Sequence, residues 1–104
     1  MKESENSNST SLYRNPCLWF YRLNVDENIN SRREIKLSKN LSPLNSKRFL
    51  QTRSCMRRAL GELLKLDPIE VPLLADPNKP PIILNGFGHI SISHTDTALI
   101  IVWD

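Results

Sequence analysis

Ser91, Ser93 and His94 end an apolar segment, and their side chains are of types that can hold a phosphate. The serines alternate with isoleucines, and this period of two predicts a strand with the hydroxyls on one face and the imidazole at its end. A Ser-His pair for acyl transfer needs facing side chains and a third group that orients the imidazole, which adjacent residues rarely provide. The spacing is also typical of a plain structural turn, in which Ser93 and Asp96 bond to the local backbone.

Cationic side chains with restricted positions form a second candidate set. Lys79 lies in a proline-rich loop next to Pro80, and the prolines limit where its ammonium group can go. Arg48, Arg53 and Arg57 recur along a predicted helix, at the borders of its apolar arc. Arginines at such borders usually lay their stems on the core and keep their heads in water. Each cation alone is typical of an ordinary surface, but together they favour an anion site.

Charge is unevenly distributed along the chain, although the net charge is only +3. Residues 32–58 contain nine Lys and Arg and a single acid, whereas residues 59–104 contain two bases and six acids. A basic block on a nearly neutral chain favours contact with a polyanion. The block does not distinguish a nucleotide from a nucleic acid or an acidic protein. The sequence carries no recognisable RNA- or DNA-binding signature.

A length of 104 residues predicts at most one domain. Residues 1–16 are dominated by Glu, Ser, Asn and Thr, and we expect a disordered polar tail there, followed by a folded domain over 17–104. The apolar runs are shorter than the roughly 20 residues that span a bilayer, and the first residues lack a signal peptide's apolar core. Cys17 and Cys55 match no metal or disulfide spacing, which favours reduced thiols. We therefore expect a cytoplasmic protein.

Helix and strand patterns predict how these side chains are positioned. Apolar residues at helical spacing predict one long helix over 46–66, which begins at Ser46 and ends before Asp67 and Pro68. The order of a strand, a helix and then several strands predicts an α+β fold, with one long helix packed on a small, mostly antiparallel sheet. The expected strands are 18–25, 69–73, 82–84, 89–93 and 97–103.

Three segments together resemble a known family. Arg48-Phe49 with Arg53 and Arg57, then Asn78-Lys79-Pro80, and then Ser91-Ile92-Ser93-His94-Thr95 occur in this order. They resemble motifs of 4′-phosphopantetheinyl transferases, in the larger class whose single chain holds two similar halves. The resemblance covers residues 18–104 and corresponds to the N-terminal half of that fold.

The resemblance implies coenzyme A as the ligand. By position, Arg48 would contact the 3′-phosphate region, and Lys79, Pro80, Ser93 and His94 would hold the phosphates and the adenosine end. Arg53 and Arg57 would be supporting residues. In the family, a serine of an apo acyl or peptidyl carrier protein attacks the diphosphate and receives the phosphopantetheine arm, with Mg²⁺ as the cofactor. Such transfer serves fatty acid or polyketide biosynthesis.

Some positions depart from the family pattern. Asn78 stands where the family usually has Gly, and Ser91 stands where Asn is common. The family's Asp-x-Glu metal pair lies beyond the strand that matches residues 98–103, so no residue of this chain is predicted to be catalytic or to bind the metal. We expect the isolated chain to transfer little or nothing and to self-associate through an exposed half-domain face. The alternative is a non-enzymatic basic module that binds nucleic acid or protein.

Overall fold

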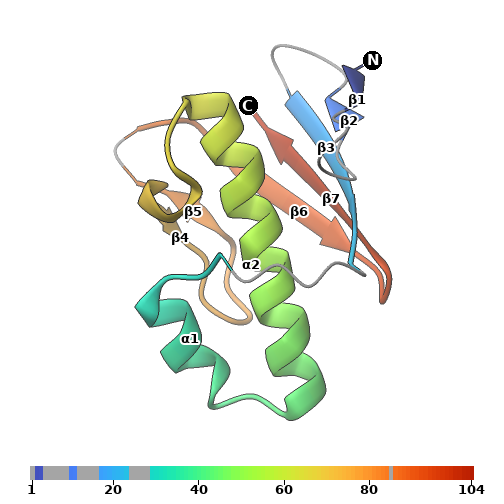
Figure 1. Ribbon diagram of the computed structural model, residues 1–104, viewed down its shortest axis with the longest axis vertical. Coiled ribbons are helices and arrows are strands. Elements are labelled where there is room, and N and C mark those ends of the chain that lie inside the picture. The colour runs from blue at the N-terminus through green and yellow to red at the C-terminus, as the bar shows by residue number, and fades with distance from the viewer. Residues whose placement is uncertain (1, 4–9, 12–16, 24–28, 85) are drawn as a thin grey trace.

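A long helix, α2 (Pro43–Leu64), lies across a three-stranded antiparallel sheet in the computed structural model (Figure 1). The model describes residues 2–3, 10–11, 17–23, 29–84 and 86–104. A short helix and a two-stranded sheet flank α2 on the side away from the N-terminus. The α+β prediction, with one long helix on a small antiparallel sheet, is confirmed.

The main sheet has the strand order β3-β7-β6, with β7 (Ala98–Trp103) between β3 (Cys17–Arg22) and β6 (Ile90–His94). Because side chains alternate along each strand, the sheet has one buried face and one partly exposed face. Trp19 and Ile101 are cross-strand partners and are buried, whereas the next pair along, Phe20 and Ile100, is partly exposed on the opposite face. The predicted strands at 89–93 and 97–103 match β6 and β7 closely. The predicted strand 18–25 matches β3 up to Arg22, and its last residues lie outside the described part of the chain.

Helix α2 begins three residues before the predicted start. Ser42 is the N-cap, because its hydroxyl accepts the Asn45 N–H at 3.3 Å, and Pro43 takes the first helical position, where no N–H is needed. At the other end Lys65 adopts a left-handed conformation and its N–H donates to the Gly61 carbonyl. The helix therefore ends at Leu64 rather than Leu66.

A short helix, α1 (Arg32–Ser38), is absent from the sequence predictions. Its sequence lacks an apolar stripe, and a capping box at its start satisfies the backbone instead. Glu34 N–H donates to the Ser31 hydroxyl at 3.1 Å, and Ser31 N–H donates to the Glu34 carboxylate at 3.0 Å. Local side-chain bonds thus form a helix that periodicity does not reveal.

The strand predicted over 69–73 is wrong. Pro68–Glu70 forms a 3₁₀ turn, η1, because Pro68 fixes a helical φ and Asp67 accepts the Ile69 N–H at 3.2 Å. Extended structure starts only at β4 (Leu73–Leu74), which pairs with β5 (Ile82–Ile83). The β5 strand falls within the predicted 82–84.

The N-terminal residues are described only in part. Lys2–Glu3 (β1) pairs with Thr10–Ser11 (β2), close to β3. The expected disordered tail over 1–16 otherwise lies outside the described residues. Among the helices that the structure describes, none combines the length and apolarity needed to cross a membrane.

Candidate anion-binding site

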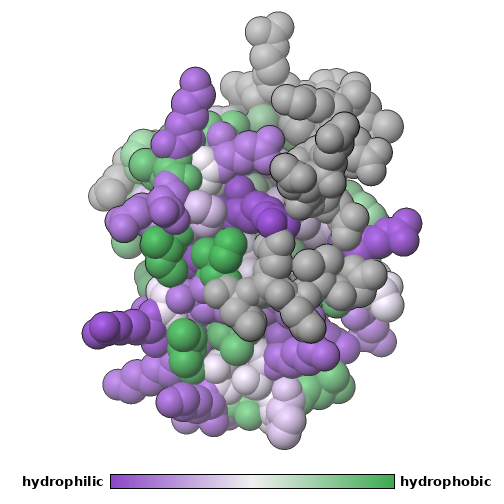
Figure 2. Space-filling model, in the orientation of Figure 1, coloured by the Kyte–Doolittle hydropathy of each residue, from purple (hydrophilic) through white to green (hydrophobic). Residues whose placement is uncertain are grey.

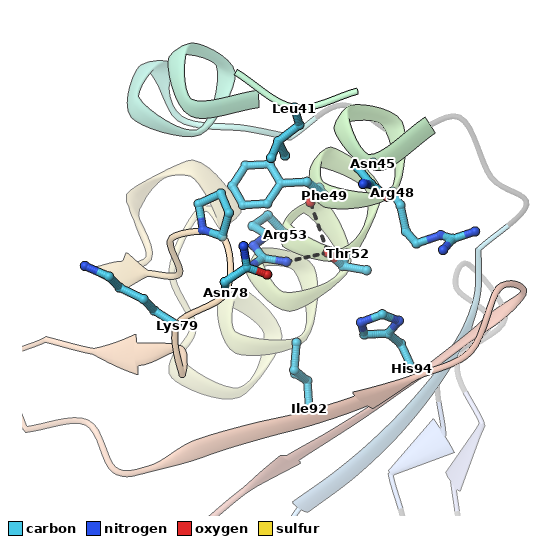
Figure 3. Close-up of a pocket in the computed structure, with 11 residues that line it drawn as sticks. Leu41, Asn45, Arg48, Phe49, Thr52, Arg53, Asn78, Lys79, Ile92 and His94 are labelled. Carbon is cyan, nitrogen blue, oxygen red and sulfur yellow. Dashed lines mark hydrogen bonds between the residues drawn. The ribbon is translucent and has the colours of Figure 1, made fainter. Parts of the chain in front are cut away.

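A pocket of about 420 Å³ lies between the first half of α2, the loop after β4 and the end of β6 (Figure 3). Arg48, Lys79 and His94 all line it, although they belong to different motifs and different elements. The fold brings these three predicted residues together, although they lie far apart in the sequence. The pocket's full lining is Leu41, Asn45, Arg48, Phe49, Thr52, Arg53, Pro77, Asn78, Lys79, Ile92 and His94.

Two of the predicted ligand residues lie elsewhere. Ile92 and His94 project from β6 toward α2 (Figure 3), so Ser93, between them, faces the opposite side of the sheet and does not line the pocket. Pro80 follows Lys79 directly and is exposed outside the lining. The serine hydroxyl is therefore in the wrong place to share a ligand with His94 across this pocket.

Lys79 is carried by a tight turn. Its N–H donates to the Asp76 carbonyl at 3.3 Å, and Asn78 between them has a φ of 62°. Pro77 at the second position and a positive φ at the third are the features of a type II turn. Asparagine tolerates this left-handed conformation better than most residues with a side chain, so Asn78 fits the turn.

The turn is held by arginines from both helices. From α2, Arg53 donates through Nε to the Ala75 carbonyl at 2.9 Å. From α1, Arg33 forms a two-pronged ion pair with Asp76, at 3.1 Å through Nε and 2.6 Å through Nη2. The bond to Arg33 holds the pKa of Asp76 below its ordinary value and raises that of Arg33. Both contacts restrict the backbone that carries Lys79.

Arg53 also forms part of the pocket wall. It is 9% exposed, its guanidinium lies 4.2 Å from the centre of the Phe49 ring, and Nη1 donates to the Thr52 hydroxyl at 2.8 Å. Burial lowers the pKa of Arg53 to about 10, with the negative charges of Glu34 and Asp76 opposing that shift. The group therefore stays charged at neutral pH, and the expectation that its head lies in water is wrong.

Arg57 does not reach the pocket. It is 3% exposed and pairs with the buried Glu34 of α1, with Nε and Nη2 at 3.0 and 2.9 Å from the two carboxylate oxygens. Its Nη1 donates to the Val71 carbonyl at 2.9 Å. The prediction of a water-facing border arginine is wrong here too, because Arg57 joins α1 and the segment after η1 to α2.

Arg48 lies at the opposite side of the pocket from Lys79 (Figure 3) and contacts the β6–β7 turn. Its Nη2 is 3.2 Å from Oδ1 of Asp96. Within the turn the Thr95 hydroxyl accepts the N–H groups of Thr97 and Ala98, at 3.3 and 3.2 Å. The expectation that Ser93 and Asp96 stabilise this turn locally is corrected, since Thr95 does so and Asp96 pairs with an arginine.

The electrostatics of the pocket favour an anion. Arg48, Arg53 and Lys79 contribute positive charge, and His94 adds an imidazole. The neighbouring carboxylates, Asp76 and Asp96, are already paired with arginines. Leu41, Phe49 and Ile92 add apolar surface, so the pocket suits a ligand with both an apolar and an anionic part.

This donor set does not fit Mg²⁺, which prefers six oxygen ligands. Within the described ranges, no group of three or more His, Cys, Asp and Glu side chains gathers into a metal site. The cationic lining would in addition repel a divalent cation.

Asn45 and Thr52 are pocket residues that the sequence reasoning missed. Together with Arg48, Phe49 and Arg53 they recur at intervals of three and four, which places them on one face of α2. This helical spacing could have predicted that the residues share a face. It was overlooked because the face combines polar and apolar residues, whereas the helix was identified from its apolar residues alone. Comparison with known proteins adds nothing to this picture: no protein-family model, curated protein or solved structure matches the chain.

Proposed function

We propose that the pocket binds the phosphate-bearing end of coenzyme A, and that the chain is the coenzyme A-binding half of a cytoplasmic 4′-phosphopantetheinyl transferase. The complete enzyme would move the phosphopantetheine arm to a serine of an apo carrier protein. The observation that carries the proposal is the meeting of Arg48, Lys79 and His94 in one pocket. These residues come from three separate motifs that resemble that family, and nothing in their sequence spacing requires them to meet.

The chemistry of the pocket suits this ligand. Charge-assisted hydrogen bonds from arginine and lysine are the strong contacts for phosphate oxygens. The volume of about 420 Å³ falls within the range of small-molecule sites, and Phe49 with Ile92 offers apolar surface for a base. Lys79 is exposed at the end of a restrained turn, and its side chain points away from Arg48 and His94 in Figure 3. Its ammonium would reach a phosphate by a turn of the side chain, without ordering much backbone.

The pocket offers binding and orientation, without a carboxylate that could take the proton of a serine. In the described part of the chain, its lining contains neither Asp nor Glu and does not fit Mg²⁺. The proposal therefore assigns proton transfer and metal binding to residues outside this pocket.

The exposed cations among residues 32–58 support a carrier protein as the partner of the proposed enzyme. Arg33, Arg53 and Arg57 have partners inside the protein. Figure 2 shows hydrophilic side chains projecting around α1 and the start of α2. An acidic carrier protein would be attracted to such a surface. The exposed cations there are Arg32, Lys36, Lys39 and Lys47.

Calorimetric titration with coenzyme A and dephospho-coenzyme A tests the proposal. We expect the wild-type chain to prefer coenzyme A, because the additional 3′-phosphate gains a cationic partner. Arg48→Ala and Lys79→Ala should each weaken binding about tenfold or more, since a hydrogen bond to a charged group is worth about 1.5–3 kcal/mol. His94→Ala should weaken it less.

Lys47→Ala is the matched control, because Lys47 is an exposed cation on α2 outside the lining. A wild-type chain that does not bind coenzyme A, or an equal loss in the Lys47 variant, would contradict the proposal. Tight oligonucleotide binding that weakens steeply with salt, together with no coenzyme A binding, would favour the nucleic-acid alternative instead.

A further inference from the structure

Arg48, a cation that lines one side of the pocket, already has a carboxylate partner within the protein. Its Nη2 lies 3.2 Å from Asp96 Oδ1. The side chain of Arg48 is 28% exposed, whereas that of Asp96 is 86% exposed. A carboxylate so open to water is weakly held, because solvent screens the pair and the side chain can turn outward at little cost.

The position of Asp96 makes this contact relevant to ligand binding. Asp96 lies two residues after His94, which lines the pocket, and the Thr95 hydroxyl fixes the turn between β6 and β7 through two backbone N–H groups. The turn therefore holds Asp96 beside the start of α2 rather than leaving it on a free loop. An anion that binds Arg48 in the pocket must compete with this carboxylate.

We propose that Asp96 is a specificity-determining residue that acts as an internal competitor for the anion site. A monoanion has about the same attraction for Arg48 as the resident carboxylate, and so gains little by displacing it. A ligand with several charges on adjacent groups gains more, because Coulomb energy scales with charge and because Lys79 and Arg53 act on the same ligand. The site thus selects polyanions such as diphosphates. This inference rests on the proposed anion binding at the same pocket.

Titration of the full chain with inorganic pyrophosphate at low ionic strength tests the proposal. Asp96→Asn keeps the shape of the side chain and removes its charge, so affinity should rise about two- to fivefold, the range expected from the loss of an exposed ion pair. In an Arg48→Ala background the same substitution should change affinity by much less. The gain in the single variant should shrink as salt is added.

Glu62→Gln is the control, since it makes the same change in net charge on the exposed surface of α2, about 21 Å along the helix from Arg48. Equal affinities of wild type and Asp96→Asn would overturn the role of Asp96 and leave the anion site intact. An equal rise in pyrophosphate affinity in the Glu62→Gln variant would show that net charge alone causes the effect. That result would also overturn the role of Asp96. If neither wild type nor Asp96→Asn binds pyrophosphate or coenzyme A, the anion site itself is wrong.

Discussion

At the scale of single residues, Asn78 is the position that gives the turn before Lys79 its shape. Its φ of 62° lies in the left-handed region, where most side chains clash with the backbone. Glycine enters this region freely, and asparagine is the side-chain-bearing residue that does so most readily. The turn that carries Lys79 can therefore adopt a positive φ with a side chain present.

Substitution at this position gives a sharp prediction. Asn78→Gly should change the free energy of unfolding by less than about 0.5 kcal/mol and keep coenzyme A affinity, since Gly accepts the same φ. Asn78→Ala should cost about 1 kcal/mol and weaken binding, because Ala must strain or shift the turn. Urea unfolding and calorimetry on both variants measure the two effects. Equal unfolding free energies and equal coenzyme A affinities of the Gly and Ala variants would show that the positive φ at residue 78 is not needed.

At the scale of elements, the loop from β4 to β5 is held by contacts from both α1 and α2. Arg53 of α2 binds the Ala75 carbonyl, and Arg33 of α1 binds the Asp76 carboxylate. Each helix thus contributes one arginine to the start of the turn, at Ala75 and Asp76. These contacts restrict the backbone that carries Lys79, in addition to the prolines near it.

The Arg33–Asp76 contact makes stability depend on pH in a defined direction. The pKa of Asp76 is lowered in the folded protein, so its contribution is present above the unfolded value of about 3.9 and is lost as pH falls through the lower folded value. The difference in unfolding free energy between wild type and Asp76→Asn should therefore be largest near neutral pH and shrink below about pH 4. Urea unfolding at a series of pH values measures it, with Glu62→Gln as the control for loss of one carboxyl. A pH-independent difference would contradict this account.

At the scale of the whole molecule, the main sheet is covered unequally. Helix α2 lies over one face, while Phe20 and Ile100, which are cross-strand partners, remain 37% and 39% exposed on the other. Contiguous exposed apolar patches mark interaction surfaces, and we expect this pair to form part of one. We therefore expect self-association to occur through the sheet face that carries Phe20 and Ile100.

Light scattering coupled to size exclusion can test that location. We expect wild type to associate as its concentration rises, and Ile100→Lys to stay monomeric, because a charge on this face would be buried in the contact. Ile69→Lys is the control, since Ile69 is a similarly exposed isoleucine on η1. A wild-type chain that remains monomeric, or equal disruption by the control, would refute the assignment.

The sequence by itself determined the features that depend on local patterns. Period-two alternation located β6 and β7, and apolar residues at helical spacing located most of α2. The sequence motifs singled out Arg48, Lys79, Pro80, Ser93 and His94 as candidates, of which Pro80 and Ser93 do not line the pocket. These signals are readable because side-chain direction repeats within a strand or helix whatever surrounds it. By contrast, α1 left no such signal, because its capping box and the buried Glu34–Arg57 pair stabilise it.

Only the tertiary structure decided which of the candidate residues lie together. Arg53 and Arg57 look alike on a helical wheel, yet one forms a pocket wall and the other a buried ion pair. Ser93 and His94 are neighbours in sequence, yet alternation along β6 puts them on opposite faces of the sheet, and only His94 lines the pocket. Burial and long-range pairing depend on what packs against each side chain, and that information is distributed over segments far apart in the chain rather than contained in any one of them.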